Sequence, residues 1–231
     1  MKTLFETLQR KWAEYLLEMI VITAGILGAY ALNNWNESKK SDKLEVEMLR
    51  EIKVGLEGDL KDIDYNLKAQ INILKSQNIL IDWLEGDLPY ADSLSHHFSR
   101  VNASTVFISN EGPYETLKQL GIRLITNDSL RDQILKVYDL SFQDYKEHVV
   151  FYNDFFTHGL KFINVDYFSS SDFFNEMTPL DKDEIRRDNT YLYHLKTIRN
   201  LDDHYIEMKI KEAKMSAEKT IKMIDDELSK R

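Results

Sequence analysis

The stretch YLLEMIVITAGILGAYALNNW, Tyr15 to Trp35, decides the fold, because no other run in this chain is apolar and long enough to cross a bilayer. At about 1.5 Å per residue it reaches about 31 Å, close to the hydrocarbon thickness of a membrane. An aromatic side chain stands at each end, where amphipathic rings favour the headgroup level. Basic Arg10 and Lys11 precede the run. The sequence therefore predicts a transmembrane helix over residues 15–35.

Two alternatives to a membrane anchor stay open. The uninterrupted part, Met19–Leu32, is shorter because Glu18 precedes it, and a run of that length also suits a buried core helix. A secretory signal peptide likewise has basic residues before an apolar run. Cleavage is disfavoured because the small residues lie inside the run, which passes through Asn33, Asn34 and Trp35 into a charged helical pattern without a break.

Several residues of this segment are candidate membrane and oligomer contacts. They are Glu18, Ala24, Gly25, Gly28, Ala29, Asn33, Asn34 and Trp35. Ala24 with Gly28 and Gly25 with Ala29 are small-xxx-small pairs, which let two helices approach closely in lipid, although small residues are common in membrane helices. An ionisable residue such as Glu18 either contacts a partner within the membrane or reaches the interface.

Glu18, Gly25-Ile26-Leu27 and Asn33-Asn34-Trp35-Asn36-Glu37 resemble the N-terminal signature of a family of uncharacterised bacterial membrane proteins, known only as a domain of unknown function. A second, looser similarity covers Tyr114-Glu115-Thr116-Leu117-Lys118, Gly121, Asn127, Leu130, Arg131 and Tyr138. Gly28 and Ala31 stand where relatives are expected to carry larger residues. The resemblance implies a single-pass protein of the bacterial envelope with a helical domain, and it supplies no activity.

Composition fits one anchor and one helical domain. The 231 residues are 43% apolar and 30% charged, with eight Gly and three Pro, as in a well-ordered and mostly helical chain. No Cys is present, which excludes a disulfide framework and a thiolate metal site. The net charge of −9 argues against nucleic-acid binding, which depends on Lys and Arg neutralising phosphates.

We divide the chain into an interfacial amphipathic helix over residues 1–14, a transmembrane helix over 15–35, and a helical extramembrane domain over 36–231. Residues 1–14 place Leu4, Phe5, Leu8 and Trp12 on one helical face, and a frayed tail is the alternative. Basic residues nearly balance across the span, so they do not fix its orientation. A short basic N-terminal tail favours a single-pass inner-membrane protein whose bulk is periplasmic.

The fold class we expect is all-α. The transmembrane helix continues into a long helix to about Leu84, whose apolar residues repeat every 11 positions from Leu49 to Leu74. Gly55 and Gly58 within it indicate a close crossing or a bend, or are a tolerated exposed pair. Gly86, in the left-handed conformation, and Pro89 end this helix.

Shorter middle helices and a long C-terminal helix should complete an elongated bundle. Asn127-Asp128-Ser129 offers N-caps for a helix that reaches about His158. Thr178-Pro179 is typical of the N-cap and first position of a short helix, with Asp181 three residues on. Asp188 or Asn189 caps the last helix, which reaches about Leu228 and packs antiparallel to the first long helix.

No catalytic, cofactor-binding or metal-ligating constellation is evident, and we expect no enzyme. None of the residues three positions before each His is a carboxylate, which excludes the Glu-x-x-His pairs of ferritin-like dimetal sites. Phosphate loops and nucleophile elbows are absent. The carboxylate–histidine pairs at helical spacing, Asp144–His148, Asp154–His158 and His204–Glu207, are interpreted as ion pairs.

The sequence favours a membrane-anchored helical interaction or scaffold protein, self-associating or an accessory subunit of a bacterial envelope complex. Its partners are then the lipid bilayer and either a second copy or other membrane-complex subunits. The alternative is a ligand-binding sensory domain that signals through a partner. In that case the aromatic-rich segment 151–174 lines a ligand pocket, although such a segment more often packs in a core.

Overall fold

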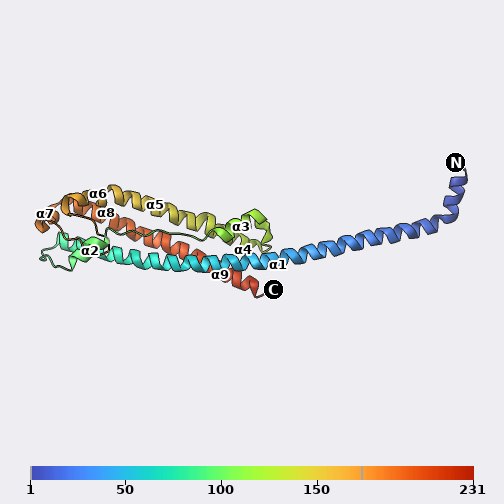
Figure 1. Ribbon diagram of the computed structural model, residues 1–231, viewed down its shortest axis with the longest axis horizontal. Helices are drawn as coiled ribbons and strands as arrows, with labels where there is room; N and C mark the ends of the chain where they lie inside the picture. Colours follow the sequence, from blue (N-terminus) through green and yellow to red (C-terminus); the bar gives the residue numbers. More distant parts are fainter. Residues whose placement is uncertain (1, 173) are drawn as a thin grey trace. The chain divides into compact units, whose positions relative to one another are not determined.

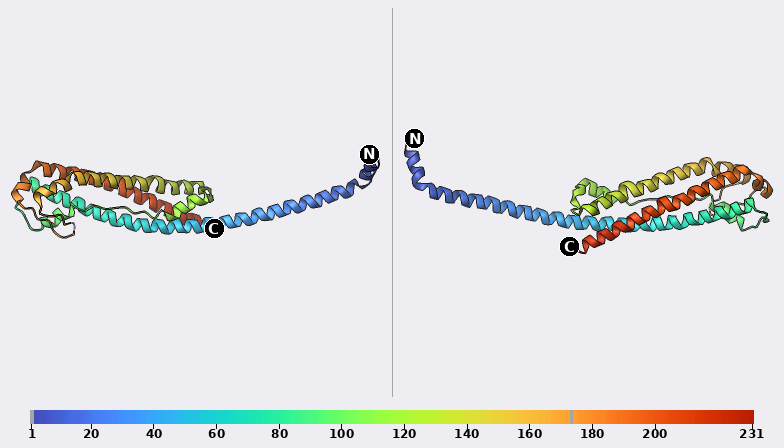
Figure 2. Two further views of the ribbon diagram at one scale, coloured as in Figure 1. Left: turned by 45° about the horizontal axis from the view of Figure 1, so that its top comes forward. Right: turned by 180° about the vertical axis from the view of Figure 1, so that it is seen from behind.

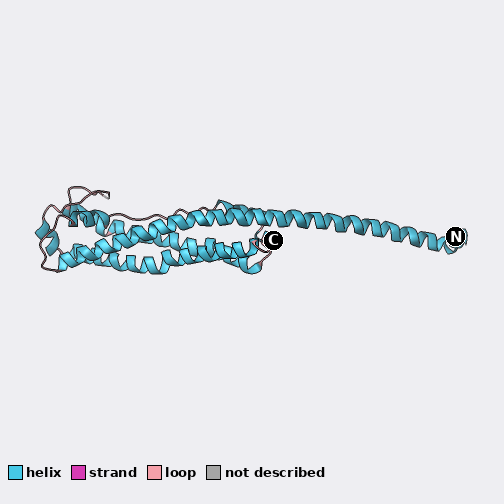
Figure 3. Cartoon of the chain, turned by 90° about the horizontal axis from the view of Figure 1, so that it is seen from below, coloured by secondary structure: helices cyan, strands magenta, loops and turns pink. Residues whose placement is uncertain are grey.

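The computed structural model describes the backbone of residues 2–172 and 174–231, and the side chains from Trp12 onward except Phe173 and Glu207. Contacts divide the chain into two compact units, of which the first ends at Met48 and the second is Leu49–Arg231. The part of the chain that is described contains helices and no strand (Figure 3). The all-α fold class is therefore confirmed.

Helix α1 runs from Lys2 to Glu85 without interruption. Of the predicted interfacial helix over 1–14, residues 2–14 belong to α1, but the side chains of Leu4, Phe5 and Leu8 lie outside the described residues. Every side chain from Trp12 to Leu44 is exposed. The prediction of an amphipathic face over residues 1–14 therefore stays a prediction.

Gly86 follows α1 for a different reason from the one predicted. Its N–H donates to Asp82 O at 3.0 Å, and a Cβ at this position would lie 2.8 Å from that same oxygen. Among the described residues, only Gly121 has a positive φ, of 100°. The prediction that Gly86 takes the left-handed conformation is therefore wrong, and close approach to the last helical turn explains the glycine.

The second unit is a bundle of three long helical rods (Figure 1). The first rod is residues 49–85 of α1. The middle rod, residues 128–158, comprises α4 (Asp128–Leu135), the π-helical η2 (Lys136–Ser141) and α5 (Phe142–His158). The C-terminal rod, residues 189–228, comprises α8 (Asn189–Tyr205), the π-helical η3 (Ile206–Ile210) and α9 (Lys211–Leu228). Shorter helices connect them: α2 (Leu94–Arg100), α3 (Gly112–Leu120), η1 (Ile122–Leu124), α6 (Leu160–Tyr167) and α7 (Lys182–Arg187).

The first and C-terminal rods pack antiparallel, as predicted (Figure 2). Lys53 Nζ lies 2.6 Å from Asp225 Oδ1, and Lys214 Nζ lies 2.7 Å from Asp64 Oδ1. Residue numbers thus rise along one rod while they fall along the other. Such partly exposed ion pairs contribute little stability, so the buried side chains between the rods hold this register.

The buried face of α1 changes character along the second unit. Its first half largely follows the predicted apolar stripe, since Leu49, Ile52, Leu56 and Ile63 are fully buried and Leu60 is half-buried. Beyond Ile63 the predicted stripe positions are only partly buried. The buried positions there are instead Asn66, Gln70, Ile73, Ser76, Gln77, Leu80, Ile81, Trp83 and Leu84. This part of the stripe was therefore wrongly assigned, because amides occupy the helix face that points into the bundle.

Helix caps confirm two predictions and correct one. Asn127 accepts from Leu130 N at 3.2 Å, and Asp188 accepts from Thr190 N at 2.7 Å. The expected helix start at Thr178-Pro179 is wrong, because Asp181 itself is the N-cap of α7. The N–H of the preceding residue, Leu180, donates to Tyr167 O at 2.9 Å, so this segment is held by the end of α6 and does not start a helix.

The two glycines of α1 have different surroundings. Gly55 is buried, and a Cβ there would lie 3.6 Å from Asn110 and Pro113, so it marks a close crossing with the chain at the start of α3. Gly58 is exposed, and a Cβ added at its Cα would meet no atom within 4 Å. The exposed-glycine alternative therefore holds for Gly58 alone.

Replacing Gly58 by Ala should raise the free energy of unfolding by about 1 kcal/mol, because Ala loses less backbone entropy in a helix interior and meets no neighbour here. Urea unfolding of the detergent-solubilised full chain, followed by circular dichroism at a helical wavelength, measures the change. An unchanged or lower midpoint would contradict the helical environment described for Gly58.

Candidate functional site

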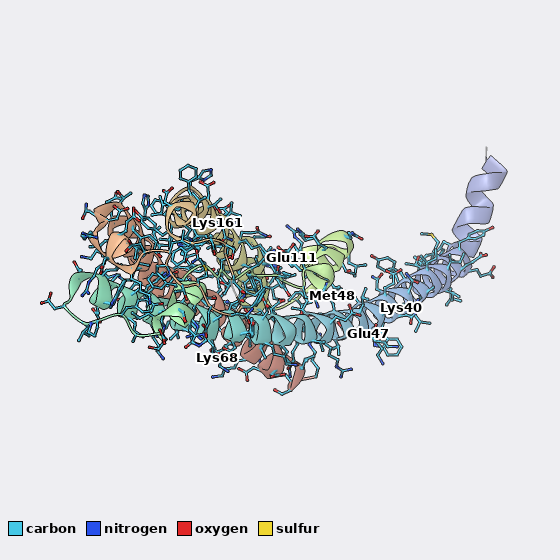
Figure 4. All side chains as sticks on the ribbon, turned by 60° about the vertical axis from the view of Figure 1, so that its left-hand side comes forward. Lys40, Glu47, Met48, Lys68, Glu111 and Lys161 are labelled. Atoms are coloured by element: carbon cyan, nitrogen blue, oxygen red, sulfur yellow. The ribbon has the colours of Figure 1, made fainter. Side chains whose placement is uncertain are left out.

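An exposed apolar surface covers α1 within the first unit. Large side chains such as Ile20, Ile26 and Leu32 are exposed, Ile26 by 65%. No residue is buried in the apolar part of this helix, which by length and composition alone could cross a membrane. Side chains project from all sides of this part of α1, including the segment around Lys40 (Figure 4). A monomer in water rarely exposes a continuous apolar surface of this extent.

The predicted small-residue contacts lie within this surface. A Cβ added at Gly25 or at Gly28 would meet nothing within 4 Å, and Ala24 and Ala29 are exposed. At 100° per residue, positions 18, 25, 28 and 29 fall on one face of the helix. Glu18 therefore shares a face with the small residues, and the described part of the chain packs nothing against that face.

The polar end of the segment is ordered by local contacts. Asn33 Nδ2 donates to Glu37 Oε1 at 3.1 Å, one helical turn further on. Lys39 Nζ lies 4.2 Å from the centre of the Trp35 ring, as a cation above an aromatic face. Asn34 is exposed. The end of the apolar run thus carries an aromatic ring with an adjacent cation, an arrangement suited to the headgroup level of a bilayer.

A second polar feature, the buried carboxylate of Asp202, lies inside the second unit. Asp202 is fully buried on α8. The side-chain amides of Gln70 and Gln77 donate to its two oxygens, and Tyr152 Oη donates to Oδ2 at 3.2 Å. Thr105 Oγ1 in turn donates to Gln70 Oε1 at 3.3 Å. All three helical rods therefore meet at this one carboxyl group.

Burial raises the pKa of Asp202 from its ordinary 3.8 to about 7, while the hydrogen bonds from Gln77, Gln70 and Tyr152 oppose that rise. No cation donates to the carboxyl among the described contacts. Burial likewise raises the pKa of Asp59 to about 6, where Asn110 N donates to its Oδ1 at 2.6 Å. Both carboxyl groups hold their protons more tightly in the folded chain than in the unfolded one.

The Asp202 cluster is not among the sites predicted from the sequence, although the sequence contains a signal for it. Asp202 lies four residues after Ile198 and three before Tyr205, both buried, so it occupies the apolar face of the C-terminal rod. The π-helical η3 begins shortly afterwards, at Ile206. Single turns of π-helix often occur at functional positions.

Within the described part of the chain, one of the three predicted carboxylate–histidine pairs is formed. His158 Nδ1 lies 3.2 Å from Asp154 Oδ1, as predicted. Asp144 instead pairs with Lys209 at 2.6 Å, and the His148 ring stacks on Tyr205, with centroids 5.0 Å apart. The predicted partner of His204, Glu207, has its side chain outside the described residues. Among the residues whose positions are described, no group of three or more His, Asp or Glu is arranged to hold a metal ion.

The aromatic segment 151–174 divides between the core and the surface. Tyr152, Phe156 and Phe168 are buried, and Phe168 packs against Phe98 with ring centroids 5.4 Å apart. The exposed aromatics of this segment are Phe151, Phe162 and Phe174. Phe173 lies outside the described residues. The core interpretation therefore holds for part of the segment only.

Comparison with known proteins identifies one family. The family described as "Family of unknown function (DUF6090)" matches residues 18–204. Neither the curated proteins nor the solved structures contain a match to this chain.

Because the pKa of Asp202 is raised on folding, the free energy of unfolding should depend on pH. Because the folded chain binds this proton more tightly, the contribution of Asp202 to the free energy of unfolding is full below about pH 4 and is lost as the pH rises towards 7. Asp202→Asn should flatten the fall in stability over that interval. Urea unfolding of the solubilised full chain at several pH values measures the slope.

Two controls accompany this test. Asp59 is unchanged in Asp202→Asn, so the free energy of unfolding of this variant should still fall as the pH rises, but by less than in the unaltered chain. Asp202→Leu should lower the free energy of unfolding at every pH by about 1–3 kcal/mol for each buried donor left without an acceptor. An unaltered pH slope in Asp202→Asn would mean that Asp202 does not titrate in this interval.

Proposed function

The chain belongs to the DUF6090 family, a family of unknown function, and we propose that it is a membrane-anchored helical scaffold. In this proposal α1 crosses the inner membrane of a bacterial cell once over residues 15–35, and the helical domain lies on the periplasmic side. The protein self-associates or serves as an accessory subunit of an envelope complex. The observation that carries the proposal is the exposed apolar surface of α1 from Tyr15 to Trp35.

Lipid is the best-matched environment for this surface. The exposed apolar side chains surround the helix on every side, whereas a helix that docks on a protein partner usually keeps one polar face. Inside a bilayer the helical backbone satisfies its own hydrogen bonds, and the side chains need no polar partner. The aromatic residues at both ends of the run support the same placement.

Self-association is proposed because one face of the span differs from the others. Gly25, Gly28 and Ala29 share that face with Glu18 and would let a second helix approach closely. Glu18 is exposed in the single chain, and an ionisable residue within a span usually contacts a partner. The supporting surface is thus self-complementary, which suits a twofold contact between identical chains.

Membrane insertion is tested by introducing charge into the span. Val21→Lys, Ile22→Lys and Ile26→Lys together should move the chain from the carbonate-resistant membrane pellet to the supernatant, because each central Lys costs about 2.5–3.5 kcal/mol of insertion free energy. Fractionation of the expressing cells, followed by immunoblotting, measures the distribution.

The matched control places three Lys at exposed apolar positions of the second unit, Val54, Val150 and Val165. This variant should remain in the membrane pellet. The anchor proposal fails if the unaltered chain is recovered in the soluble fraction, or if both triple variants behave alike.

Self-association is tested by enlarging the small-residue face. Gly25→Leu with Gly28→Leu should convert the assembly to monomers, because Leu keeps the span apolar but prevents close approach. Native mass determination of the detergent-solubilised chain gives the number of copies. Thr23→Leu, on the opposite face of the helix, is the control and should leave the assembly intact. A monomer in the unaltered protein would refute self-association.

A further inference from the structure

Two neighbouring cavities lie in the second unit. The first, of about 390 Å³, is lined mainly by Asn102, Asn153, Phe156, Thr157, Lys161 and Phe174. The second, of about 420 Å³, lies beside α1 and α2 and shares Ala103, Ser104 and Phe174 with the first. Both volumes are in the range of small-molecule sites in proteins.

The charge of the cavity walls differs from that of the rest of the chain. The net charge is −9, yet no Asp or Glu is among the described residues that line either cavity. Lys161 of α6, which is labelled in Figure 4, is one of the residues that line the first cavity. Arg100 and His96 line the second, and His96 is already paired with Glu176 at 3.1 Å. Within the described part of the chain no carboxylate pairs with Lys161, so its charge is available to an anion.

The walls of the first cavity are held in place by hydrogen bonds. Asn102 Nδ2 donates to Phe98 O at 2.7 Å, and the amide of Asn164 donates to Asn102 Oδ1. Asp172, which does not line the cavity, accepts at its Oδ1 from Phe174 N at 2.9 Å and from Asn175 N at 3.0 Å, and so fixes the backbone that carries Phe174. These contacts fix the Asn102 wall and the backbone at Phe174 before any ligand arrives, which lowers part of the entropy cost of binding.

Phe174 adds an aromatic surface to this polar wall. Its side chain is 94% exposed although it borders both cavities. The ring of Phe156 lies in the wall of the first cavity and is almost fully buried. A flat ring placed between these residues would remove apolar area of Phe174 from water and gain ring-to-ring contact.

We propose that the first cavity binds a small aromatic carboxylate, with its ring against Phe174 and Phe156 and its carboxylate at Lys161. The exposed hydroxyls of Ser104 and Thr157 line the same cavity and would donate to the second carboxylate oxygen. One Lys rather than a cluster of Arg favours a monoanion over a phosphate ester. This ligand site goes beyond the scaffold function and does not depend on it.

Calorimetric titration of the full chain in zwitterionic lipid nanodiscs tests the proposal, with empty nanodiscs as the blank. The probes are indole-3-acetate and its neutral isostere indole-3-acetamide. The acid should bind, and the amide should bind about fivefold more weakly or not at all, because it lacks the charge that faces Lys161. Absence of binding by the acid, or equal binding of acid and amide, would overturn the proposal.

Matched variants locate the site. Lys161→Gln should weaken binding of indole-3-acetate by about fivefold, the effect of one ion pair near the surface. Phe174→Ser, tested as a separate variant, should also weaken binding, because the ligand ring loses its apolar contact. Lys222→Gln, on α9 and lining neither cavity, should leave binding unchanged. Circular dichroism confirms that each variant is folded. The assignment to this cavity would be overturned if Lys161→Gln bound indole-3-acetate as tightly as the unaltered chain, whether or not Arg100→Gln weakened binding.

Discussion

The constraint on which the rest depends is the exposed apolar surface of α1 between Tyr15 and Trp35. Burying apolar area is the main favourable contribution to folding, and this segment buries none within its own chain. Water is therefore the wrong solvent for it. A bilayer or a protein partner must supply the missing contacts, and the all-round distribution of the apolar residues favours lipid. The aromatic and polar residues at its end, Asn33 to Trp35, suit the boundary of such a solvent.

The second unit differs from this segment, because its three rods bury side chains against one another. Leu49, Ile52 and Leu56 pack as an ordinary apolar stripe, whereas the middle of the bundle contains Asp202 with amide and hydroxyl donors around it. A buried carboxyl group without a cation costs free energy, and its hydrogen bonds recover only part of that cost. It also ties α1, α5 and α8 together in one register, since shifting any rod would separate the donors from the acceptor.

Much of the fold was predictable because it follows from local rules. The caps Asn127 and Asp188 were identified from side chains that accept backbone N–H groups, and the apolar run of α1 from composition alone. The first half of the α1 stripe was correct because Leu and Ile occupy its buried positions. The second half of the stripe was wrong, because the buried positions there include Gln70 and Gln77. Their amides donate to Asp202, which is more than 100 residues away in sequence. A periodicity count treats buried amides as surface.

The candidate sites divide in the same way. The small residues and Glu18 were found from spacing within one helix, which the sequence displays directly. The cavity beside Lys161 brings together α5, α6 and the segments around Asn102 and Phe174, which are separated in the sequence and meet only in the folded bundle. The aromatic content of residues 151–174 indicated a ligand pocket as one alternative. It did not indicate which rings are exposed, because their exposure depends on tertiary packing such as that of α6 against α8.

If lipid surrounds the middle of the apolar segment, a thiol placed there is shielded from water-soluble reagents, and the chain has no native Cys to interfere with that measurement. Single Cys residues at Ile26 and at Val54, both exposed in the single chain, would be treated in native membranes with a charged maleimide from each side of the bilayer. We expect Ile26→Cys to react only after the membrane is dissolved, whereas Val54→Cys should react from one side. Equal and rapid labelling of both positions in intact membranes would contradict the placement of this segment in lipid.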